Sequence, residues 1–402
     1  MLVIGLSARC ALRSGRQRVP DGRKQMSYAA GVVSLATVIK QWGRIGCLGF
    51  GGPPAHIALF RQLCVDRRQW IDAREFEDAI AACNLLPGPA STQLAIYCAW
   101  RVRGRAGALV GGLAFIVPGL VAILALAALF LGDPPTWVRA AGAGAGSAVA
   151  AIALQSGAML VPASWKRAVR VRWAAYLLLG AVAAATVGPW LVLVLIACGI
   201  AEIAAQRLPV SDQRPAPLVA VFGGAALLPL AWTALKVGAL SYGGGFVIIP
   251  LMQADAVGQH HWMTAAEFLD AVALGQITPG PVVHTVAVVG YAAAGLLGGL
   301  LAAAVAFSPS FTFILLGAHR FDRLRGNRRV GAFLDGAGPA AIGAILGSAV
   351  PLLRALTEPW QYAVFAGAAA LALALRRGPV LTLLAAATAG VAIVLAGGPL
   401  PR

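Results

Sequence analysis

Residues 85–94 read LLPGPASTQL, and residues 275–284 read GQITPGPVVH. Each stretch lies within an apolar run and has Pro-Gly-Pro near its middle, at 87–89 and at 279–281. Proline lacks a backbone N–H and glycine readily leaves helical geometry, so neither run can be one unbroken helix. The sequence therefore predicts a pair of half-helices at each place.

The two stretches recur at a fixed spacing, and the same spacing aligns much of the chain with itself. Between residues 44–100 and 236–292 there are 18 identities in 57 pairs, including the Pro-Gly-Pro triplets. A fixed internal period of this kind indicates repeated structural units. We expect a basic N-terminal tail (1–27), a first repeat (28–205), a polar linker (206–217) and a second repeat (218–397).

The composition is that of a membrane protein. Of 402 residues, 59% are hydrophobic and 12% are charged, against about 25% charged in ordinary soluble domains. These numbers exclude a soluble enzyme, a disordered scaffold and a nucleic-acid-binding module. The lipid bilayer is thus a partner, and nucleic acid is not. The net charge of +17 comes mainly from short basic clusters between apolar runs, as the positive-inside rule produces.

The basic clusters fall in opposite loops of the two halves. Residues 61–74 and 101–105 contain seven arginines, whereas the matching segments of the second half contain no Lys or Arg. At the next loop the bias is reversed, and at the loop after that it reverses again. We therefore predict an all-α polytopic membrane protein with two inverted-topology repeats and broken, re-entrant half-helices. The basic tail favours an internal N-terminus and strict inversion an external one, unless a further crossing lies between residues 28 and 60.

Broken helices at matching positions of two repeats indicate a transport site. A helix that starts inside the membrane presents free N–H groups and partial positive charge to an anion. Glycines let further N–H groups approach an oxyanion. The candidate substrate-binding residues at the breaks are Gly51, Gly52, His56, Pro87, Gly88, Pro89, Ser91, Thr92, Gln93, Gly243, Gly244, Gln276, Thr278, Pro279, Gly280, Pro281 and His284.

Charged residues near the breaks are the next candidates. Arg44 and Lys236 occupy equivalent positions before the glycine-rich segments, and Lys40 lies one turn before Arg44. Cations within a membrane are costly, so they are functional candidates. The alternative is that they reach the interface or pair with Asp78 or Asp270, which are themselves candidate proton carriers or ion-pair partners.

Several other chemistries find little support. The histidines do not match between the halves, so we expect no metal site. No catalytic motif indicates an enzyme, and nothing indicates a cofactor. Glu75 and Glu267 stand three residues after Asp72 and Thr264, which predicts capping boxes that open two helices. His56 has either a hydrogen-bonding or proton-carrying role or a packing role.

Segments 49–56 (GFGGPPAH), 85–94 and 276–281 (QITPGP) resemble those of the chromate ion transporter family in its two-domain form, and the likeness runs from about residue 28. The resemblance implies a multi-pass carrier of the bacterial inner membrane that exports chromate and confers resistance. Sulfate is a structurally similar dianion. The chain departs from internal symmetry at Gly245-Phe246, which stand opposite Pro53-Pro54.

We therefore expect a secondary transporter of divalent oxyanions, with chromate efflux driven by the membrane potential, a proton gradient or both. Import or exchange of sulfate or another oxyanion is the alternative within transport. A membrane structural subunit is the alternative from another class. The sequence also leaves a homodimer open.

Overall fold

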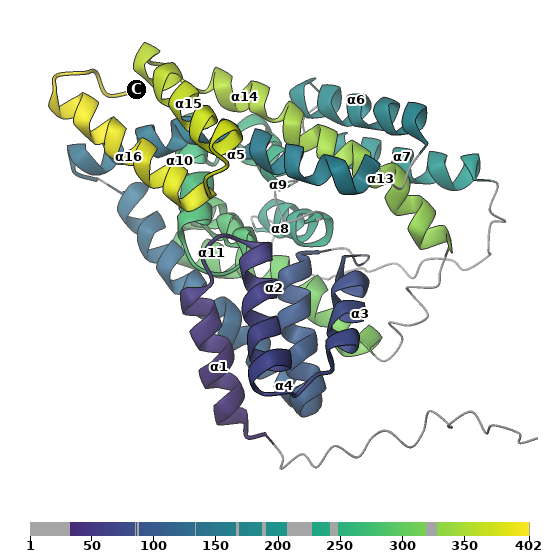
Figure 1. Cartoon of the computed structure of the whole chain (residues 1–402). Coiled ribbons are helices and arrows are strands. Elements are labelled where there is room, and N and C mark those ends of the chain that lie inside the picture. Colours follow the sequence, from purple (N-terminus) through teal and green to yellow (C-terminus); the bar gives the residue numbers. More distant parts are fainter. Residues whose placement is uncertain are drawn as a thin grey trace, which may run out of the picture. The chain divides into compact units, whose positions relative to one another are not determined.

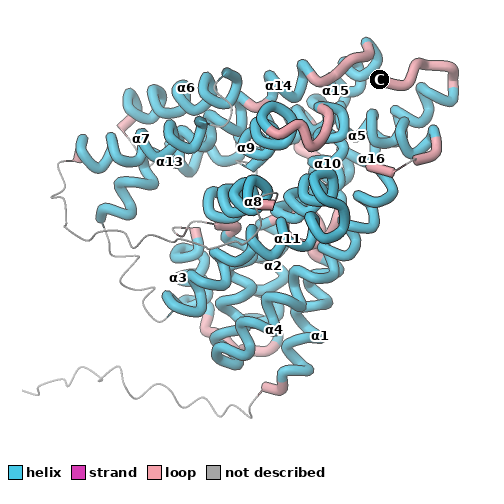
Figure 2. The backbone as a smooth tube through the Cα atoms, turned by 180° about the vertical axis from the view of Figure 1, so that it is seen from behind, coloured by secondary structure: helices cyan, strands magenta, loops and turns pink. Residues whose placement is uncertain are grey.

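The computed structural model describes residues 33–84, 86, 88–132, 134–165, 169–186, 190–206, 227–241, 248–318 and 328–401. Ser34–Arg402 form one compact unit. Within the described ranges the secondary structure is entirely helical, without a strand (Figure 2). In the described part of the chain, four helices are long and apolar enough to cross a membrane: Ala90–Phe130, Thr136–Pro162, Val282–Gly317 and Arg328–Arg354. The expected all-α membrane fold is confirmed.

The helices follow the same order in both halves (Figure 1). The first half comprises α1 (Leu35–Leu48), α2 (Pro53–Arg61), η1 (Gln62–Arg67), α3 (Ala73–Cys83), α4 (Ala90–Phe130), α5 (Thr136–Trp165), α6 (Arg170–Thr186) and α7 (Leu191–Ala205). The second comprises α8 (Leu228–Leu240), α9 (Ile248–Gln253), η3 (Ala254–Gln259), α10 (Ala265–Ile277), η4 (Val282–His284), α11 (Thr285–Gly317), α13 (Arg328–Gly347), α14 (Ala349–Arg354), α15 (Pro359–Ala369), η6 (Ala370–Ala374) and α16 (Pro379–Leu395).

Local irregularities also recur in the second half. The π-helices η1 and η3 are of equal length and lie at the repeat spacing. Both Pro-Gly-Pro glycines, Gly88 and Gly280, have positive φ. Sharp reversals occur at Gly104 (φ 63°) and Gly295 (φ 62°), whose separation is one residue short of the repeat spacing. The alignment of the two halves at the fixed repeat spacing is therefore off by one position at these turns. A turn can lose or gain one residue without disturbing side-chain packing, whereas a packed helix cannot.

The first Pro-Gly-Pro break lies between two antiparallel half-helices, as predicted. Arg101, near the end of the first part of α4, forms an ion pair with Glu75 at the start of α3. The Tyr97 hydroxyl donates to the same carboxylate at 3.3 Å. The outer ends of the two arms therefore lie together. At Arg103–Gly104 the chain reverses and begins the long apolar part of α4.

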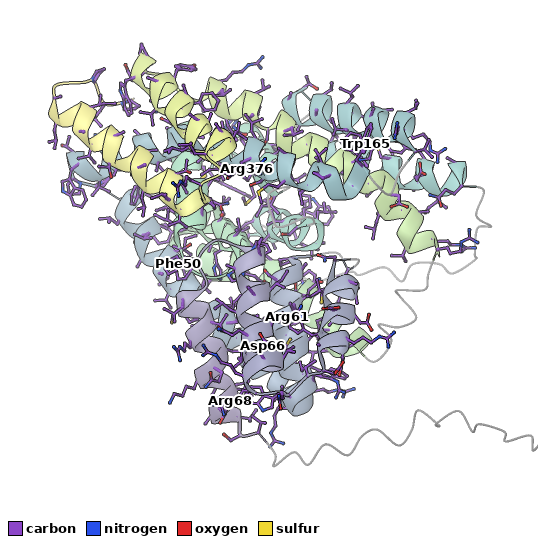
Figure 3. The ribbon with its side chains drawn as sticks, in the orientation of Figure 1. Phe50, Arg61, Asp66, Arg68, Trp165 and Arg376 are labelled. Atoms are coloured by element: carbon purple, nitrogen blue, oxygen red, sulfur yellow. The ribbon has the colours of Figure 1, made fainter. Side chains whose placement is uncertain are left out.

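α1 and α2 form a second broken hairpin around Gly49–Gly52. Trp42 of α1 packs against Phe60 of α2, and its indole N–H donates to the Ala95 carbonyl at 2.8 Å. Arg68 lies near the end of this bundle where α1 begins, whereas Phe50 lies near the other end (Figure 3). The chain thus turns back between residues 35 and 61, which brings the start of α1 to the same end of the bundle as Arg68.

The long helices pack closely through glycines. A side chain at Gly144 of α5 would collide with the Ala386 carbonyl of α16, and one at Gly336 of α13 with the Cys198 carbonyl of α7. These contacts fit the packing role expected of small residues.

One of the two expected capping boxes forms. In α10, the Thr264 hydroxyl accepts from the Glu267 N–H, and the Glu267 carboxylate accepts from the Thr264 N–H. In α3, the Asp72 side chain caps the helix, but Glu75 does not return to it. The capping-box prediction for Glu75 is wrong, because its carboxylate pairs with Arg101 instead.

Candidate functional site

The broken segments of each half contact helices of the other half. The Gly49 carbonyl, where α1 ends, accepts from the Gly280 N–H of the second Pro-Gly-Pro at 3.0 Å. The same oxygen lies 2.9 Å from His56 Nε2. A hydrogen on this nitrogen makes the His56 ring a second donor to one carbonyl. His56 therefore makes a hydrogen bond at a junction of the two halves, and its ring also packs edge-on against Phe115, with ring centroids 5.1 Å apart.

The reciprocal contact involves the first Pro-Gly-Pro. A Cβ at Gly88 would lie 3.3 Å from the Gly238 carbonyl of α8 and 3.2 Å from the Ser310 hydroxyl of α11. It would also approach Gln93 Nε2 to 2.7 Å. Gly88 has a φ of 120°, which side chains disfavour. Glycine therefore serves both the backbone conformation and the close approach.

Gly119 of α4 takes the place in the first half that Ser310 takes in the second, in the register set by the reversals at Gly104 and Gly295. A Cβ at Gly119 would collide with the Pro279 carbonyl and lie 2.7 Å from the His284 ring. The His284 ring also packs edge-on against Phe307 of α11, with ring centroids 5.3 Å apart. The second Pro-Gly-Pro break thus packs directly against the backbone of α4 at Gly119, where there is no side chain.

Buried polar groups gather on the segments that form these contacts. The following side-chain atoms have no hydrogen-bond partner of normal geometry within the described part of the chain: Thr92 Oγ1, Ser241 Oγ, Gln276 Nε2, Ser310 Oγ and both ring nitrogens of His284. An unmade hydrogen bond in a buried place costs about 1–3 kcal/mol per group. Such groups are explained when a ligand or water satisfies them.

The helices at the breaks start without side-chain caps. α2 begins after Gly52, α4 after Pro89 and η4 after Pro281, and no side chain accepts from their first N–H groups. Ser91, Thr92 and Gln93, in the first turn of α4, are buried. Gly51, by contrast, is exposed. The Thr278 hydroxyl already donates to the Leu274 carbonyl at 2.9 Å.

The two matched cations lie in different surroundings. Arg44 is exposed on α1, as is Lys40. Lys236 Nζ lies 2.5 Å from the buried carboxylate of Asp255 in η3. The ion pair anticipated for Lys236 therefore exists, but its partner is Asp255 and not Asp78 or Asp270. Neither cation is among the unpaired polar groups at the breaks.

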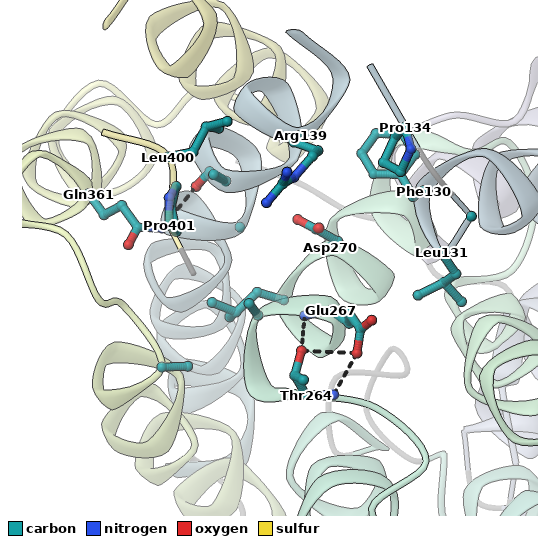
Figure 4. A pocket seen from close by; sticks show the side chains of 16 residues that line it. Phe130, Leu131, Pro134, Arg139, Thr264, Glu267, Asp270, Gln361, Leu400 and Pro401 are labelled. Atoms are coloured by element: carbon teal, nitrogen blue, oxygen red, sulfur yellow. Dashed lines mark hydrogen bonds between the residues drawn. The ribbon is translucent and has the colours of Figure 1, made fainter. Parts of the chain in front are cut away.

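The two matched aspartates also differ. Asp78 is half-buried on α3. Asp270 of α10 lies against Gly142 of α5, where an added Cβ would come 2.8 Å from its Oδ1. Asp270 and Arg139 point into a pocket of about 330 Å³ that is also lined by Glu267 (Figure 4). Asp270 thus faces a cavity away from both Pro-Gly-Pro breaks.

Some sequence predictions cannot be placed. Pro87, Gly243 and Gly244 lie outside the described residues. Among the residues described, no group of three or more His, Cys, Asp or Glu side chains could hold a metal ion.

Three residues of interest were missed by sequence reasoning: Ser310, Gly119 and Asp255. Asp255 was detectable as a carboxylate in an apolar stretch whose repeat counterpart is Leu63.

Paired broken helices that meet around buried polar groups are features of membrane transporters. Residues 36–203 and 228–391 match the family described as chromate transporter. The chain belongs to the chromate transporter family.

Similar proteins come from several bacteria. The chromate transport protein of Cupriavidus metallidurans is 34% identical, over 81% of this chain and 84% of its own. A probable chromate transport protein of Synechococcus elongatus is 31% identical, over 80% and 85%. The chromate transport protein of Pseudomonas aeruginosa is 28% identical, over 81% and 83%. No solved structure matches the chain.

Proposed function

We propose that the chain exports chromate across the bacterial inner membrane by secondary transport and thereby confers chromate resistance. The observation that carries this proposal is the meeting of each half's break with the other half, at Gly49–Gly280 and at Gly88–Gly238. Unpaired buried donors at these junctions suit a dianion that has left its hydration shell. Family membership supports chromate as the substrate.

The proposed substrate site consists of the polar groups at the junctions. Uncapped N–H groups at the start of α4 favour negative charge. The hydroxyls of Thr92 and Ser310 and the imidazole of His284 supply further hydrogen bonds. Gly119 lets the backbone approach closely, because a larger residue would collide with the opposite half, and a Cβ at Gly88 would collide with Gln93 and lie tightly against Ser310 and Gly238 of the opposite half.

The proposed orientation follows from the basic clusters. Arg67, Arg68 and Arg74 lie between the two broken hairpins, and Arg103 and Arg105 lie at the reversal in α4. The positive-inside rule assigns this end to the cytoplasm. The matching end of the second half then faces outward, which makes the repeats inverted.

Export is also the direction that the membrane potential favours. Moving a dianion out of a negative-inside cell releases about 4.6 kcal/mol per 100 mV, from about 2.3 kcal/mol per charge. A co-transported proton would lower the electrical gain and add the pH gradient. Import of sulfate against the same potential would need about two coupled cations to balance the charge.

The test is chromate accumulation by inside-out membrane vesicles with and without an imposed potential. We expect potential-dependent accumulation that vesicles lacking the protein do not show. Sulfate in excess reports how far the site distinguishes two tetrahedral dianions. Absence of accumulation by folded protein would refute chromate export, and uptake of sulfate by right-side-out vesicles would favour an importer.

A non-transporting structural role is separated by a pair of variants. Thr92→Val removes one of the unpaired hydroxyls, whereas Gly331→Ala adds a methyl group where no atom lies within 4 Å. A transporter should lose flux at normal abundance only in the first variant. If the protein has only a structural role, the chromate content of the vesicles should be the same for both variants and for the unsubstituted protein.

A further inference from the structure

The second half contains a buried carboxylate that two donors hold. Asp255 of η3 is 1% exposed, and its Oδ2 lies 2.5 Å from Lys236 Nζ. The Thr233 hydroxyl donates to the same oxygen at 2.8 Å. Both donors are on α8, three positions apart, so they lie on one face of the helix. An oxyanion group is thus cradled between α8 and η3.

The first half has the donors but not the carboxylate. The repeat spacing places Gln41 and Arg44 where the second half has Thr233 and Lys236. It places Leu63 of η1 where the second half has Asp255. The comparison of these places is direct, because η1 and η3 are π-helices of equal length at the same spacing.

A pocket of about 140 Å³ occupies this place in the first half. The pocket is lined by Gln41, Arg44 and Leu63. Two further polar residues, Gln62 and Arg67, also line it. The second half has Ala254 and Gln259 at the positions of these last two. We call this the α1–η1 pocket.

The charge in the α1–η1 pocket is uncompensated. Neither Arg44 nor Arg67 has an ion pair within the described part of the chain. The pocket therefore offers two guanidinium groups and two amides and, unlike its counterpart, no internal anion. Guanidinium groups bind carboxylate and tetrahedral oxyanions in bidentate fashion.

We propose that the α1–η1 pocket binds an oxyanion in the place that the Asp255 carboxylate fills in the second half. The ligand class is a tetrahedral dianion such as sulfate or chromate. A lipid headgroup phosphate shares this chemistry. This site is distinct from the junctions at the Pro-Gly-Pro breaks, since its lining shares no residue with the unpaired polar groups there. It rests on the proposed function only for the identity of the transported anion.

The test fills the pocket with the protein's own carboxylate. Leu63→Asp copies the second half, and Leu63→Asn is its uncharged match. Binding of radiolabelled sulfate and chromate is measured on the purified full-length protein in a non-ionic detergent free of anionic lipid. We expect Leu63→Asp to weaken sulfate binding at least tenfold and Leu63→Asn to bind within about threefold of the unsubstituted protein. Equal binding by the two variants would overturn the proposal.

A second experiment substitutes exposed residues, so its result does not depend on a change in the buried interior. Arg44→Gln combined with Arg67→Gln should also reduce sulfate affinity at least tenfold, with unchanged thermal stability. Unchanged affinity in this double variant would overturn the proposal. Salt should weaken binding to the unsubstituted protein, because the interaction is ionic.

Two further arms identify the source of the anion and keep this proposal separate from transport. Thermal stabilisation by phosphatidylglycerol nanodiscs that requires Arg44 and Arg67, without sulfate binding, would support a lipid phosphate as the ligand. If the unsubstituted protein binds sulfate but vesicles that contain it accumulate no chromate, the export proposal alone would be refuted. Chromate transport with no difference between Leu63→Asp and Leu63→Asn in binding would refute the pocket alone.

Discussion

Replacing Asp255 by alanine should destabilise the protein by about 3–5 kcal/mol, the usual cost of removing one partner of a buried ion pair. The cost arises because the change leaves the ammonium group of Lys236 without its carboxylate, in a place where the Lys236 side chain is 13% exposed. The Thr233 hydroxyl would lose its acceptor as well. The double variant Lys236→Met/Asp255→Leu should recover most of this loss, since both charges are removed together.

The assay is thermal unfolding of the purified protein in detergent, followed by a thiol-reactive fluorophore. Buried thiols such as Cys64 and Cys98 report unfolding when they become accessible. We expect a midpoint several degrees lower for Asp255→Ala and a midpoint near that of the unsubstituted protein for the double variant. A single variant with an unchanged midpoint would refute the argument from buried charge.

The same double variant also tests whether Lys236 binds substrate. If the ion pair is structural, Lys236→Met/Asp255→Leu should transport chromate at close to the normal rate. Loss of flux at normal stability would instead restore Lys236 as a substrate-binding residue, as the sequence suggested.

Three further outcomes follow from the contacts at the junctions and at the hairpin ends. Gly119→Ala should abolish chromate accumulation in vesicles, because its methyl group would overlap the second Pro-Gly-Pro, whereas Gly331→Ala should transport normally; normal flux in both would refute the close approach. Thr92→Val should lower flux about tenfold or more at normal abundance, since a hydrogen bond to a charged group is worth about 1.5–3 kcal/mol. Glu75→Gln should change the unfolding free energy by no more than about 1 kcal/mol, because its ion pair with Arg101 is partly exposed; a larger loss on denaturant unfolding would contradict this.

The positions of the breaks could be predicted from sequence because their cause is local. Pro-Gly-Pro cannot remain helical, and its recurrence at the repeat spacing identified both hairpins. The return of α1 and α2 was harder to foresee. Gly49–Gly52 showed that the helix ends, but only the contact of Trp42 with Phe60 shows that the chain turns back.

The pairing of charges could not be predicted in the same way. Lys236 and Asp255 are on different helices, and their contact depends on how α8 packs against η3. The contacts between halves, such as Gly49 with Gly280, join positions that are far apart in the sequence. One difference was visible in the sequence repeat, because Leu63 in the first half corresponds to Asp255 in the second.

This difference also bears on how readily anions would be loaded from each side. Two identical inverted halves would offer the same anion pocket to both sides of the membrane. In this chain, the first half leaves Arg44 uncompensated beside Arg67, whereas the second half neutralises Lys236 with Asp255. Arg67 belongs to the basic segment 61–74, so the orientation proposed above places the uncompensated pocket toward the cytoplasmic side and the Asp255 carboxylate at the matching place toward the other side. Such an asymmetry would raise the local anion concentration on the side of the uncompensated pocket and so speed loading from that side, while the membrane potential and any coupled ion gradient set the direction of net transport.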